Sequence, residues 1–462
     1  MTGAGAPEAG GASAPAPRLG GRYWRLLVAS AAANLGDGLM SVAVVWLTSS
    51  LTREPLWLTL VALATRLPWL LLSLPAGVLA DRVDRCRLVA AMDGARCVLV
   101  LAFALLLLAV RGPAPAPDPV SHADAAPGTV LLTALCLLAF LVGCAEVLRD
   151  TTAQTLMPSL VDQRLLERAN GRLWGAETAL GGFAGPALAG ALVGVAVVVP
   201  FGAHAALLAL AGALMLTLRG DDGRRRGRAG RADSPLPPSF RRETAEGLAW
   251  LWRHRLLRTL ALLLGAFNLL GMLTSAQFVF FAQDVLGVSG GLTFGMLTTG
   301  MATGALAGSL TGDRVAERAR EGTVLRGSLL IIGTCYGVIG LLSHAAAVWA
   351  VSVAMGFAVV VWNMVTVSLR QRLIPDRLLG RVNSVYRFFG WGTMSLGALA
   401  AGALVSLLEP ELGREWALRS TYLSAAVLMA PLLLWGWPRI GSARIDAARA
   451  AAAAAEAGRL AQ

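Results

Sequence analysis

The sequence lacks lysine altogether and is poor in charge. All 40 basic side chains are arginine, and charged residues make up 15% of the 462 positions, whereas hydrophobic residues make up 56%. Soluble globular proteins carry about a quarter charged residues, so the composition disfavours a soluble protein. The apolar residues recur along the chain in blocks of roughly twenty, the length that crosses the hydrocarbon core of a bilayer. This pattern predicts a polytopic membrane protein.

Cysteine and histidine are also scarce. The five cysteines form no C-x-x-C pair and mostly fall inside apolar blocks, and the four histidines are dispersed. An odd number of scattered cysteines disfavours a disulfide framework and a zinc site. No nucleophile with a paired base is evident, and the glycine-rich run at 287–295 enters a membrane helix without a preceding strand, unlike a phosphate-binding loop. We therefore expect neither an enzyme nor a bound metal or cofactor.

The positive charge is unevenly distributed. A formal net charge of +12 would suggest a nucleic-acid partner in a soluble protein. Here the arginines gather in alternate connections between apolar blocks, near 82–87, 164–168, 224–226, 314–318 and 372–377. This is the pattern of the positive-inside rule. It predicts a multi-pass protein of the plasma membrane with both termini in the cytoplasm and no nucleic-acid partner.

The apolar blocks form two sets of six, one within 21–218 and the other within 256–437. The expected spans are 22–49, 56–80, 87–110, 129–155, 171–198 and 200–218, followed by 256–283, 291–313, 323–343, 346–370, 384–407 and 418–437. In the 219–255 linker, Phe240, Leu248 and Trp252 share a face with Leu256, which predicts an amphipathic helix on the membrane surface. Residues 1–20 are expected to be a disordered cytoplasmic tail, and 438–462 a second cytoplasmic tail.

The two sets are related by an internal duplication. The sequence R-L-L-x-R-x-N begins at Arg164 and again at Arg377, and D-R-V occurs at 81–83 and again at 313–315. The proline-rich insertion at 111–128 accounts for the unequal spacing of these repeats. Six-span repeats around a site near the bilayer midplane are a transporter architecture. We therefore expect an all-α fold of twelve transmembrane helices in two pseudo-symmetric six-helix bundles.

The segment GVLADRVDRCR at 77–87 joins the second and third expected spans. It resembles the signature of the major facilitator superfamily, G-x-x-x-D-R-x-G-R-R/K, with Asp84 where glycine is usual and Cys86 before the last basic residue. The resemblance implies a cytoplasmic gate in which the aspartate meets the start of span eleven and the arginine meets an acid at the end of span four. The alternative is a short basic turn. The implied gate residues are Gly77, Asp81, Arg82, Arg85, Asp150, Asp313, Arg314 and Arg381.

The fifth expected span contains GGFAGPALAG at 181–190. It resembles the Gly-Pro motif of antiporter families, G-x-x-x-G-P-x-x-G-G, and the matching residues are Gly181, Gly185, Pro186 and Gly190. Small residues allow close helix contact, so a merely structural role is the alternative. Together with ANLGDGL at 33–39 and the loops at 158–170 and 375–385, these motifs resemble the enterobactin- and macrolide-exporter-like branch of the superfamily. This resemblance implies export by antiport.

Few ionisable residues lie deep in the expected spans, where each is costly unless paired or hydrated. Asp37 and Arg66 lie at similar depth in the first two spans, so we expect them to face one another. The proton affinity of a carboxylate depends on burial and on nearby cations, which makes Asp37 the main candidate for proton coupling. Arg66, Glu146 and Glu177 complete this set. A static ion pair is the alternative, but the repeat-related position of Asp37 is Gly271, so the fold does not demand a charge there.

The candidate residues of a substrate cavity are uncharged. They are Asn34, Asn268, Gln277, Trp362 and Asn363. Amide and aromatic groups in a mostly apolar chamber suit a bulky amphipathic ligand, although they are equally typical of interhelical hydrogen bonds.

These features predict a secondary active transporter. We expect a monomeric proton-coupled antiporter in the lipid bilayer that exports a small amphipathic molecule, such as a drug, a macrolide-like compound or a siderophore, by alternating access. The proton gradient supplies the energy, and no cofactor is expected. Two alternatives stay open. Proton-coupled uptake of a nutrient is disfavoured by the Gly-Pro motif, and a non-transporting membrane scaffold would need a folded module outside the membrane, for which the tails and the linker are too short.

Overall fold

The computed structural model describes residues 19–111, 125–161, 165–218, 240–374 and 376–460, with the side chains of some helical residues in these ranges outside the description. All regular elements in these ranges are helical. The first bundle contains α1 (Gly21–Leu51), α2 (Pro55–Arg82), α3 (Arg85–Arg111), α4 (Ala125–Leu160), α5 (Leu166–Ala176), η2 (Glu177–Ala184), α6 (Gly185–Val195) and α7 (Val199–Thr217). The second half contains α9 (Phe240–Arg253), α10 (Arg255–Ser275), α11 (Phe278–Phe280), η3 (Phe281–Val285), α12 (Gly291–Arg318), α13 (Glu321–Leu341), α14 (Ala345–Leu373), α15 (Asp376–Gly436) and α16 (Ser442–Leu460).

Proline and glycine mark several helix boundaries. Pro55 and Pro200 lie in the first turn of α2 and α7, where a missing N–H removes no hydrogen bond. Gly413 interrupts α15 with a φ of +77°, a left-handed conformation that glycine adopts without steric penalty. The element therefore has two arms, which correspond to the expected spans 384–407 and 418–437.

Ten stretches of the described chain are long and apolar enough to cross a membrane. One of them, Phe389–Gly436, has 48 residues and contains the break at Gly413. The 28-residue α12 is not among the ten, although it packs along α14 and α6. The expected all-helical membrane fold is confirmed, and the number of twelve crossings stays a prediction.

The expected span 171–198 is not one regular helix. Its central part, η2, is π-helical, and the N–H of Gly185 donates to the carbonyl of Leu180, five residues earlier. Pro186 explains this local change, because proline donates no hydrogen bond and its ring clashes with the carbonyl four residues before it. Single π-helical turns inside α-helices are frequent at functional sites.

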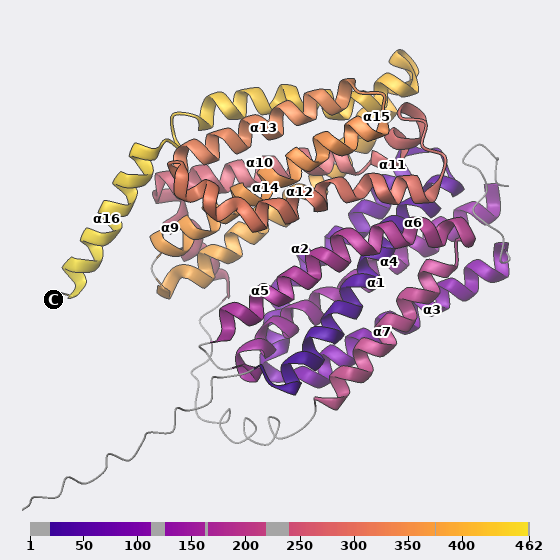
Figure 1. The fold of residues 1–462 in the computed structure, drawn as a ribbon, viewed down its shortest axis with the longest axis horizontal. Coiled ribbons are helices and arrows are strands. Elements are labelled where there is room, and N and C mark those ends of the chain that lie inside the picture. The colour runs from indigo at the N-terminus through magenta and orange to yellow at the C-terminus, as the bar shows by residue number, and fades with distance from the viewer. Residues whose placement is uncertain (1–18, 112–124, 162–164, 219–239, 375, 461–462) are drawn as a thin grey trace, which may run out of the picture.

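The helices form two bundles that lie side by side (Figure 1). In the first bundle α1 packs against α7 and α6, and α3 packs against α4 and α7; in the second, α10 packs against α15 and α12 against α14. The bundles meet through two helix pairs, α2 with α15 and α6 with α12. These two pairs place the motif of the fifth span at the interface between the halves.

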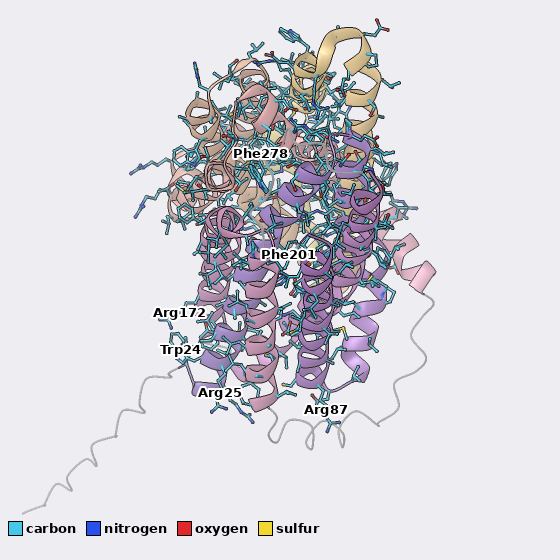
Figure 2. All side chains as sticks on the ribbon, turned by 90° about the vertical axis from the view of Figure 1, so that its right-hand side faces the viewer. Trp24, Arg25, Arg87, Arg172, Phe201 and Phe278 are labelled. Carbon is cyan, nitrogen blue, oxygen red and sulfur yellow. The ribbon has the colours of Figure 1, made fainter. Side chains whose placement is uncertain are left out.

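The two ends of the bundles differ in chemistry. Trp24, Arg25, Arg87 and Arg172 lie together at one end of the first bundle (Figure 2), and the Arg172 guanidinium stacks on Trp24 at 5.3 Å from the ring centroid. We call this the inner end, because the arginine distribution predicts that it faces the cytoplasm. The opposite end, with the connections at 52–54 and 286–290, is called the outer end.

Two further helices lie at the inner end of the second bundle. Along α9, Leu251 is buried while Leu248 and Trp252 are about two-fifths exposed, as expected for a helix with one face in lipid headgroups. The helix α16 projects from the bundle at the C-terminal end (Figure 1). It is attached by ion pairs of Asp446 with Arg320, at 2.9 Å, and of Arg449 with Glu321.

Candidate functional site

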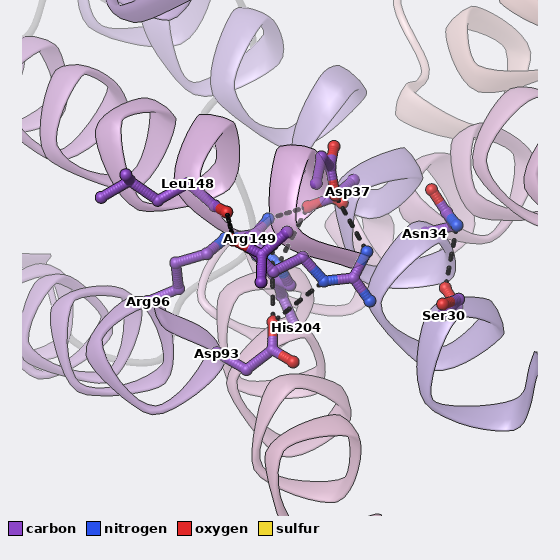
Figure 3. Close-up of polar contacts among 10 residues, drawn as sticks. Ser30, Asn34, Asp37, Asp93, Arg96, Leu148, Arg149 and His204 are labelled. Atoms are coloured by element: carbon purple, nitrogen blue, oxygen red, sulfur yellow. Dashed lines mark hydrogen bonds and ion pairs between the residues drawn. The ribbon is translucent and has the colours of Figure 1, made fainter. Parts of the chain in front are cut away.

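A network of charged side chains lies inside the first bundle (Figure 3). Asp37 of α1 accepts a hydrogen bond from the Arg96 guanidinium of α3, and the Nε2 of His204 on α7 lies 3.5 Å from the same carboxylate oxygen. Arg149 of α4 lies with its Nε 3.4 Å from an oxygen of Asp93. Four helices are therefore tied together by charge at mid-depth of the bundle.

The members of the network differ in exposure. The side chains of Asp93 and His204 have no exposed surface, and that of Arg96 is 1% exposed. Those of Asp37 and Asp150 are each 31% exposed. Because α1 is packed on several sides by α7, α6, η2 and α4, the exposed part of Asp37 lies on the remaining face of a central helix.

The local sequence makes room for these groups. Asp93 and Arg96 lie one turn apart on α3, and Arg149 bonds its neighbour Asp150 at 2.9 Å. Glycine allows the helices to approach: a Cβ at Gly36 would lie 3.0 Å from Nε2 of His204. No larger residue fits there without displacing the imidazole.

The expected pairing of Asp37 with Arg66 is wrong. The partners of Asp37 are Arg96 and His204, while Arg66 lies with its guanidinium 5.7 Å from the ring centroid of Trp391 on α15. Both residues were placed at similar depth in their spans, but depth does not specify which face of the helix a residue occupies. The sequence signal that was missed is a histidine, His204, in the middle of an apolar span.

The other two coupling candidates lie near this network. Glu146 is on α4, one turn before Arg149, and acts electrostatically on Arg66 and Arg96. Glu177 begins η2 and is exposed. Their part in coupling stays a prediction.

The glycines of the fifth span make close contacts with both neighbours. A Cβ at Gly185 would lie 2.6 Å from the Cα of Gly38 on α1, and one at Gly38 would lie 2.6 Å from the carbonyl oxygen of Gly181. On the other side, Gly190 packs directly against the backbone of Gly291 on α12, in the second bundle. The motif therefore joins α1 to α6 and the first bundle to the second.

The gate residues expected from the signature motif are only partly visible. The side chains of Gly77, Asp81, Arg82, Asp313 and Arg381 lie outside the described residues. Of the others, Arg85 begins α3 and is partly buried, Arg314 is exposed on α12, and Asp150 bonds Arg149. The contact of Arg85 with Asp150 stays a prediction.

The uncharged cavity candidates do not gather at one place. Gln277 is buried and donates to the carbonyl of Pro55 at 3.0 Å and to the Thr59 hydroxyl at 3.2 Å, so it bridges the halves. Trp362 is 1% exposed within an apolar cluster of the second bundle. A side chain buried to this extent presents no surface to a ligand in this conformation.

Asn34 and Asn268 make hydrogen bonds to helix backbone. Asn34 donates to the carbonyl of Ser30 in its own helix, at 2.9 Å, and Asn268 donates to that of Gly390 on α15, at 3.4 Å. Asn363 is exposed on α14. The geometry of Asn268 and Gln277 supports a role in interhelical hydrogen bonds rather than in a substrate cavity.

A second polar cluster, which we call the outer lock, joins the halves at the outer end. Arg53 bonds Asp284 at 2.6 Å, and Arg414 bonds the other oxygen of Asp284 at 2.7 Å. The amide of Gln283 donates to the Ser49 hydroxyl at 2.8 Å. Asp284 of η3 thus binds Arg53, in the connection between α1 and α2, and Arg414 of α15 at the same time.

Apolar contacts reinforce the closure of the outer end. One buried cluster contains Trp46 of α1, Leu58 of α2 and Phe294 of α12, so it continues across the interface. Further along this interface, Trp69 of α2 and Trp391 of α15 stack with ring centroids 4.8 Å apart. The two halves are therefore packed together from the outer end to this tryptophan pair.

No metal-binding cluster of three or more His, Cys, Asp or Glu side chains occurs in the described ranges. No disulfide joins any of the five cysteines, all of which lie in the described ranges. The structure thus combines buried carboxylate and imidazole groups with a packed interface between two bundles. This combination is typical of a membrane carrier.

Comparison with known proteins agrees with this geometry. The sequence profile of the Major Facilitator Superfamily matches residues 26–398. The chain is 26% identical over 430 residues to the "Multidrug efflux pump Tap" of Mycolicibacterium fortuitum, and the match covers 89% of this chain and 93% of that protein.

Two solved structures have the same fold. An inward-facing bacterial homologue of the iron transporter ferroportin has a TM-score of 0.65 at 17% identity, covering 89% of this chain and 98% of the other. The nucleoside transporter NupG has a TM-score of 0.65 at 13% identity, covering 91% and 99%. At these identities the likeness establishes the fold alone.

Proposed function

Because the chain belongs to the Major Facilitator Superfamily, and is therefore a membrane transporter rather than an enzyme, we propose that it exports a small amphipathic molecule in exchange for protons. The observation that carries this proposal is the position of Asp37. An acid at mid-depth in a membrane helix is costly unless it is paired or hydrated. Asp37 is paired on one side with Arg96 and is 31% exposed on the other, so its carboxylate can be neutralised by a proton that arrives through the exposed side.

The direction of transport is inferred from two observations. The efflux pump from Mycolicibacterium fortuitum is similar over most of both chains. The Gly-Pro motif, which is typical of antiporters, packs α6 against α1 and α12. A movement between the halves therefore changes the contacts of this motif. We therefore favour export over uptake, with a drug, a macrolide-like compound or a siderophore as the class of substrate, and a monomer in the plasma membrane as the working unit.

The transport cycle that we propose is alternating access. In this structure the outer lock and the apolar cluster at Trp46 hold the outer end closed. The gate at the inner end, built around Asp81, Arg85 and Arg381, then closes when the outer lock opens. Proton binding to Asp37 removes a charge that ties α1 to α3 and α7, which lowers the barrier to this exchange.

Transport by reconstituted protein tests the proposal. The substrate is first chosen by thermal stabilisation of the purified protein across a panel of antibiotics and siderophores. Proteoliposomes loaded with this substrate are then placed in a pH gradient of either sign. We expect substrate to move against the proton flux, with no gradient-driven movement in Asp37→Asn, which should still exchange labelled for unlabelled substrate.

Three outcomes would contradict the proposal. Movement of the substrate together with protons would identify an uptake carrier. Gradient-driven transport by Asp37→Asn at the rate of the native protein would remove Asp37 from coupling. Absence of any transport for every stabilising ligand would favour a membrane scaffold.

A further inference from the structure

We infer that His204 is a second proton-carrying residue, and that it stores in the buried interior the proton that enters through Asp37. This inference rests on the proposed proton coupling and adds a residue to that site. Three observations carry it: the burial of the ring, its lack of other partners, and the charge balance of the network.

The environment of His204 is unusual for a histidine with a structural role. Its side chain has no exposed surface, and neither ring nitrogen has a hydrogen-bond partner among the described residues. A buried imidazole normally donates to a carbonyl or a carboxylate to fix its tautomer. Here the one polar atom within ion-pair distance of Nε2 is the Asp37 carboxylate oxygen, at 3.5 Å. The ring is therefore placed against Asp37 and has no other polar task in the described structure.

The ion pairs around the ring contain more negative than positive groups. Among the described residues they join three carboxylates, of Asp37, Asp93 and Asp150, to two guanidinium groups, of Arg96 and Arg149. With these five groups ionised, one negative charge is in excess, and an unbalanced charge is costly where the surroundings are buried. A proton on His204 balances it. The imidazole is the group in this network whose ordinary titration range makes it able to gain and lose a proton near neutral pH.

The groups that face the ring come from the elements packed against α7, which are α1, α3 and α6. From α1 the ring meets Asp37, and from α3 it is influenced by Arg96. The Cys97 thiol of α3 bonds the carbonyl of Ala205, next to His204, at 3.2 Å. The residues of α6 include no titratable side chain. Asp37 therefore attracts a proton to the ring, whereas the burial of the ring and the positive charge of Arg96 oppose it.

The transfer itself is a simple proton exchange. A proton that reaches the exposed side of Asp37 forms an O–H bond on the carboxyl group. When the ring and the carboxyl approach from 3.5 Å to hydrogen-bond distance, this O–H bond breaks and an N–H bond forms on Nε2. The products are a carboxylate and an imidazolium, which pair with each other, and the carboxylate also stays paired with Arg96. The reverse transfer returns the proton to Asp37 for release.

Asp37 and His204 have different roles because their side chains differ in exposure. Asp37 can reach water because its side chain is 31% exposed, whereas His204 is fully buried and receives protons only through Asp37. While the ring stores the proton inside the bundle, substrate meets Asp37 in its ionised form. Return of the proton to Asp37 neutralises the carboxylate, the form in which the halves change orientation.

The test compares His204→Gln with His344→Gln, a substitution at an exposed histidine before α14. Proton release on binding of the stabilising substrate is measured in weakly buffered detergent solution. We expect release by the native protein and by His344→Gln, and loss of release in His204→Gln, with gradient-driven transport lost while exchange of labelled for unlabelled substrate persists. If proton release and gradient-driven transport were unchanged in His204→Gln, the role of His204 would be overturned, while coupling through Asp37 would stand. No proton-driven transport by the native protein would instead reject the proposed function.

A second measurement keeps the inference testable if His204→Gln does not fold. The protein is labelled with ¹⁵N-histidine, and the His204 signal is identified as the one that remains when His122, His254 and His344 are all replaced by Gln. We expect an imidazolium signal without substrate and a neutral ring with substrate bound. A neutral ring under both conditions at neutral pH would overturn the inference.

Discussion

The first and second bundles share sequence motifs, but their interiors are built differently. The first buries Asp93, Arg96, Arg149 and His204, whereas among the described residues of the second the buried charged group is Arg419, near the outer end. The guanidinium of Arg419 donates to the carbonyls at the end of α13, as a helix cap does. The comparison teaches that one bundle of this fold has a mostly apolar interior while the other pairs charges in its interior.

The repeat-related position of Asp37 sharpens this comparison. In the second bundle it is occupied by Gly271, where an added Cβ would meet the Tyr336 hydroxyl at an ordinary contact distance of 3.6 Å. Tyr336 belongs to an apolar cluster that includes Ile332 and Met429. The same place in the two repeats thus holds a charge network in one and a packed apolar interior in the other.

The largest expected effect comes from removing the central cation of the first bundle. Arg96→Met leaves Asp37 without its guanidinium partner and leaves Asp93 with Arg149 alone, and breaking a buried ion pair costs about 3–5 kcal/mol. We expect a large drop of the thermal unfolding temperature in detergent and loss of driven transport. The double variant Arg96→Met/Asp37→Asn removes the orphaned charge of Asp37, so it should regain part of the stability. Equal stability of both variants would contradict the pairing of Arg96 with Asp37.

The second experiment places a charge in the apolar interior of the second bundle. Gly271→Asp should destabilise the protein by about 2.5–3.5 kcal/mol, the insertion cost of an acid at the centre of a membrane helix. Gly271→Ala is the control, since the space at this site accepts a methyl group and alanine favours a helix. Thermal unfolding measures both. If Gly271→Asp were as stable as Gly271→Ala, the two interiors would not differ in the way that we describe.

The third experiment concerns the close contact between α6 and α1 at Gly185. Gly185→Ala puts a methyl group 2.6 Å from the Cα of Gly38, and overpacking of this kind costs about 1–3 kcal/mol. Gly194→Ala on the same helix meets no atom within 4 Å, so it should be neutral or slightly stabilising. We expect reduced transport and a lower unfolding temperature for the first variant only. A similar response of both would show that the Gly185 contact does not matter.

The smallest expected effect is at the outer lock. Arg53→Gln removes a half-exposed ion pair with Asp284, which is worth about 1 kcal/mol or less. Such a change shifts the population of outward-open protein by about fivefold at most. Labelling of Ser49→Cys by an impermeant maleimide, quantified by mass spectrometry, reports this opening, because Ser49 is 1% exposed in the closed form.

The control for the outer lock is Arg320→Gln, which removes an exposed ion pair with Asp446 at the inner end. We expect no change of the labelling rate at residue 49 in this variant. Faster labelling in Arg320→Gln than in Arg53→Gln would contradict the assignment of the lock to the outer end.

Much of the fold is contained in local patterns. Apolar blocks of membrane length, the repeated R-L-L-x-R-x-N and the alternating arginine loops are each readable without knowledge of the tertiary structure, because a bilayer imposes length and polarity on every span. The close contacts of Gly181, Gly185 and Gly190 were also foreseeable, since small residues spaced along one helix face have few other uses in a membrane.

The partners of the buried charges were not foreseeable from these patterns. Asp37 and Arg66 were expected to pair because they lie at the same depth, but pairing also depends on the rotation of each helix about its axis and on which helices are neighbours. In the structure α1 lies against α7 and α3 reaches the same place, so Arg96 and His204 meet Asp37. The same reason applies to Gln277, which precedes α11 and bridges the halves because it lies against Pro55 and Thr59 at the start of α2.

The sequence by itself determined that this protein is a helical membrane transporter, because hydrophobic length and charge distribution are one-dimensional properties of the chain. The tertiary structure alone decided which charges lie together, that His204 faces Asp37, and that Asp284 pairs with Arg53 and Arg414 across the two halves. These are relations between side chains far apart in the chain, and Coulomb energy in a medium of low dielectric changes steeply with the few ångströms that only packing sets.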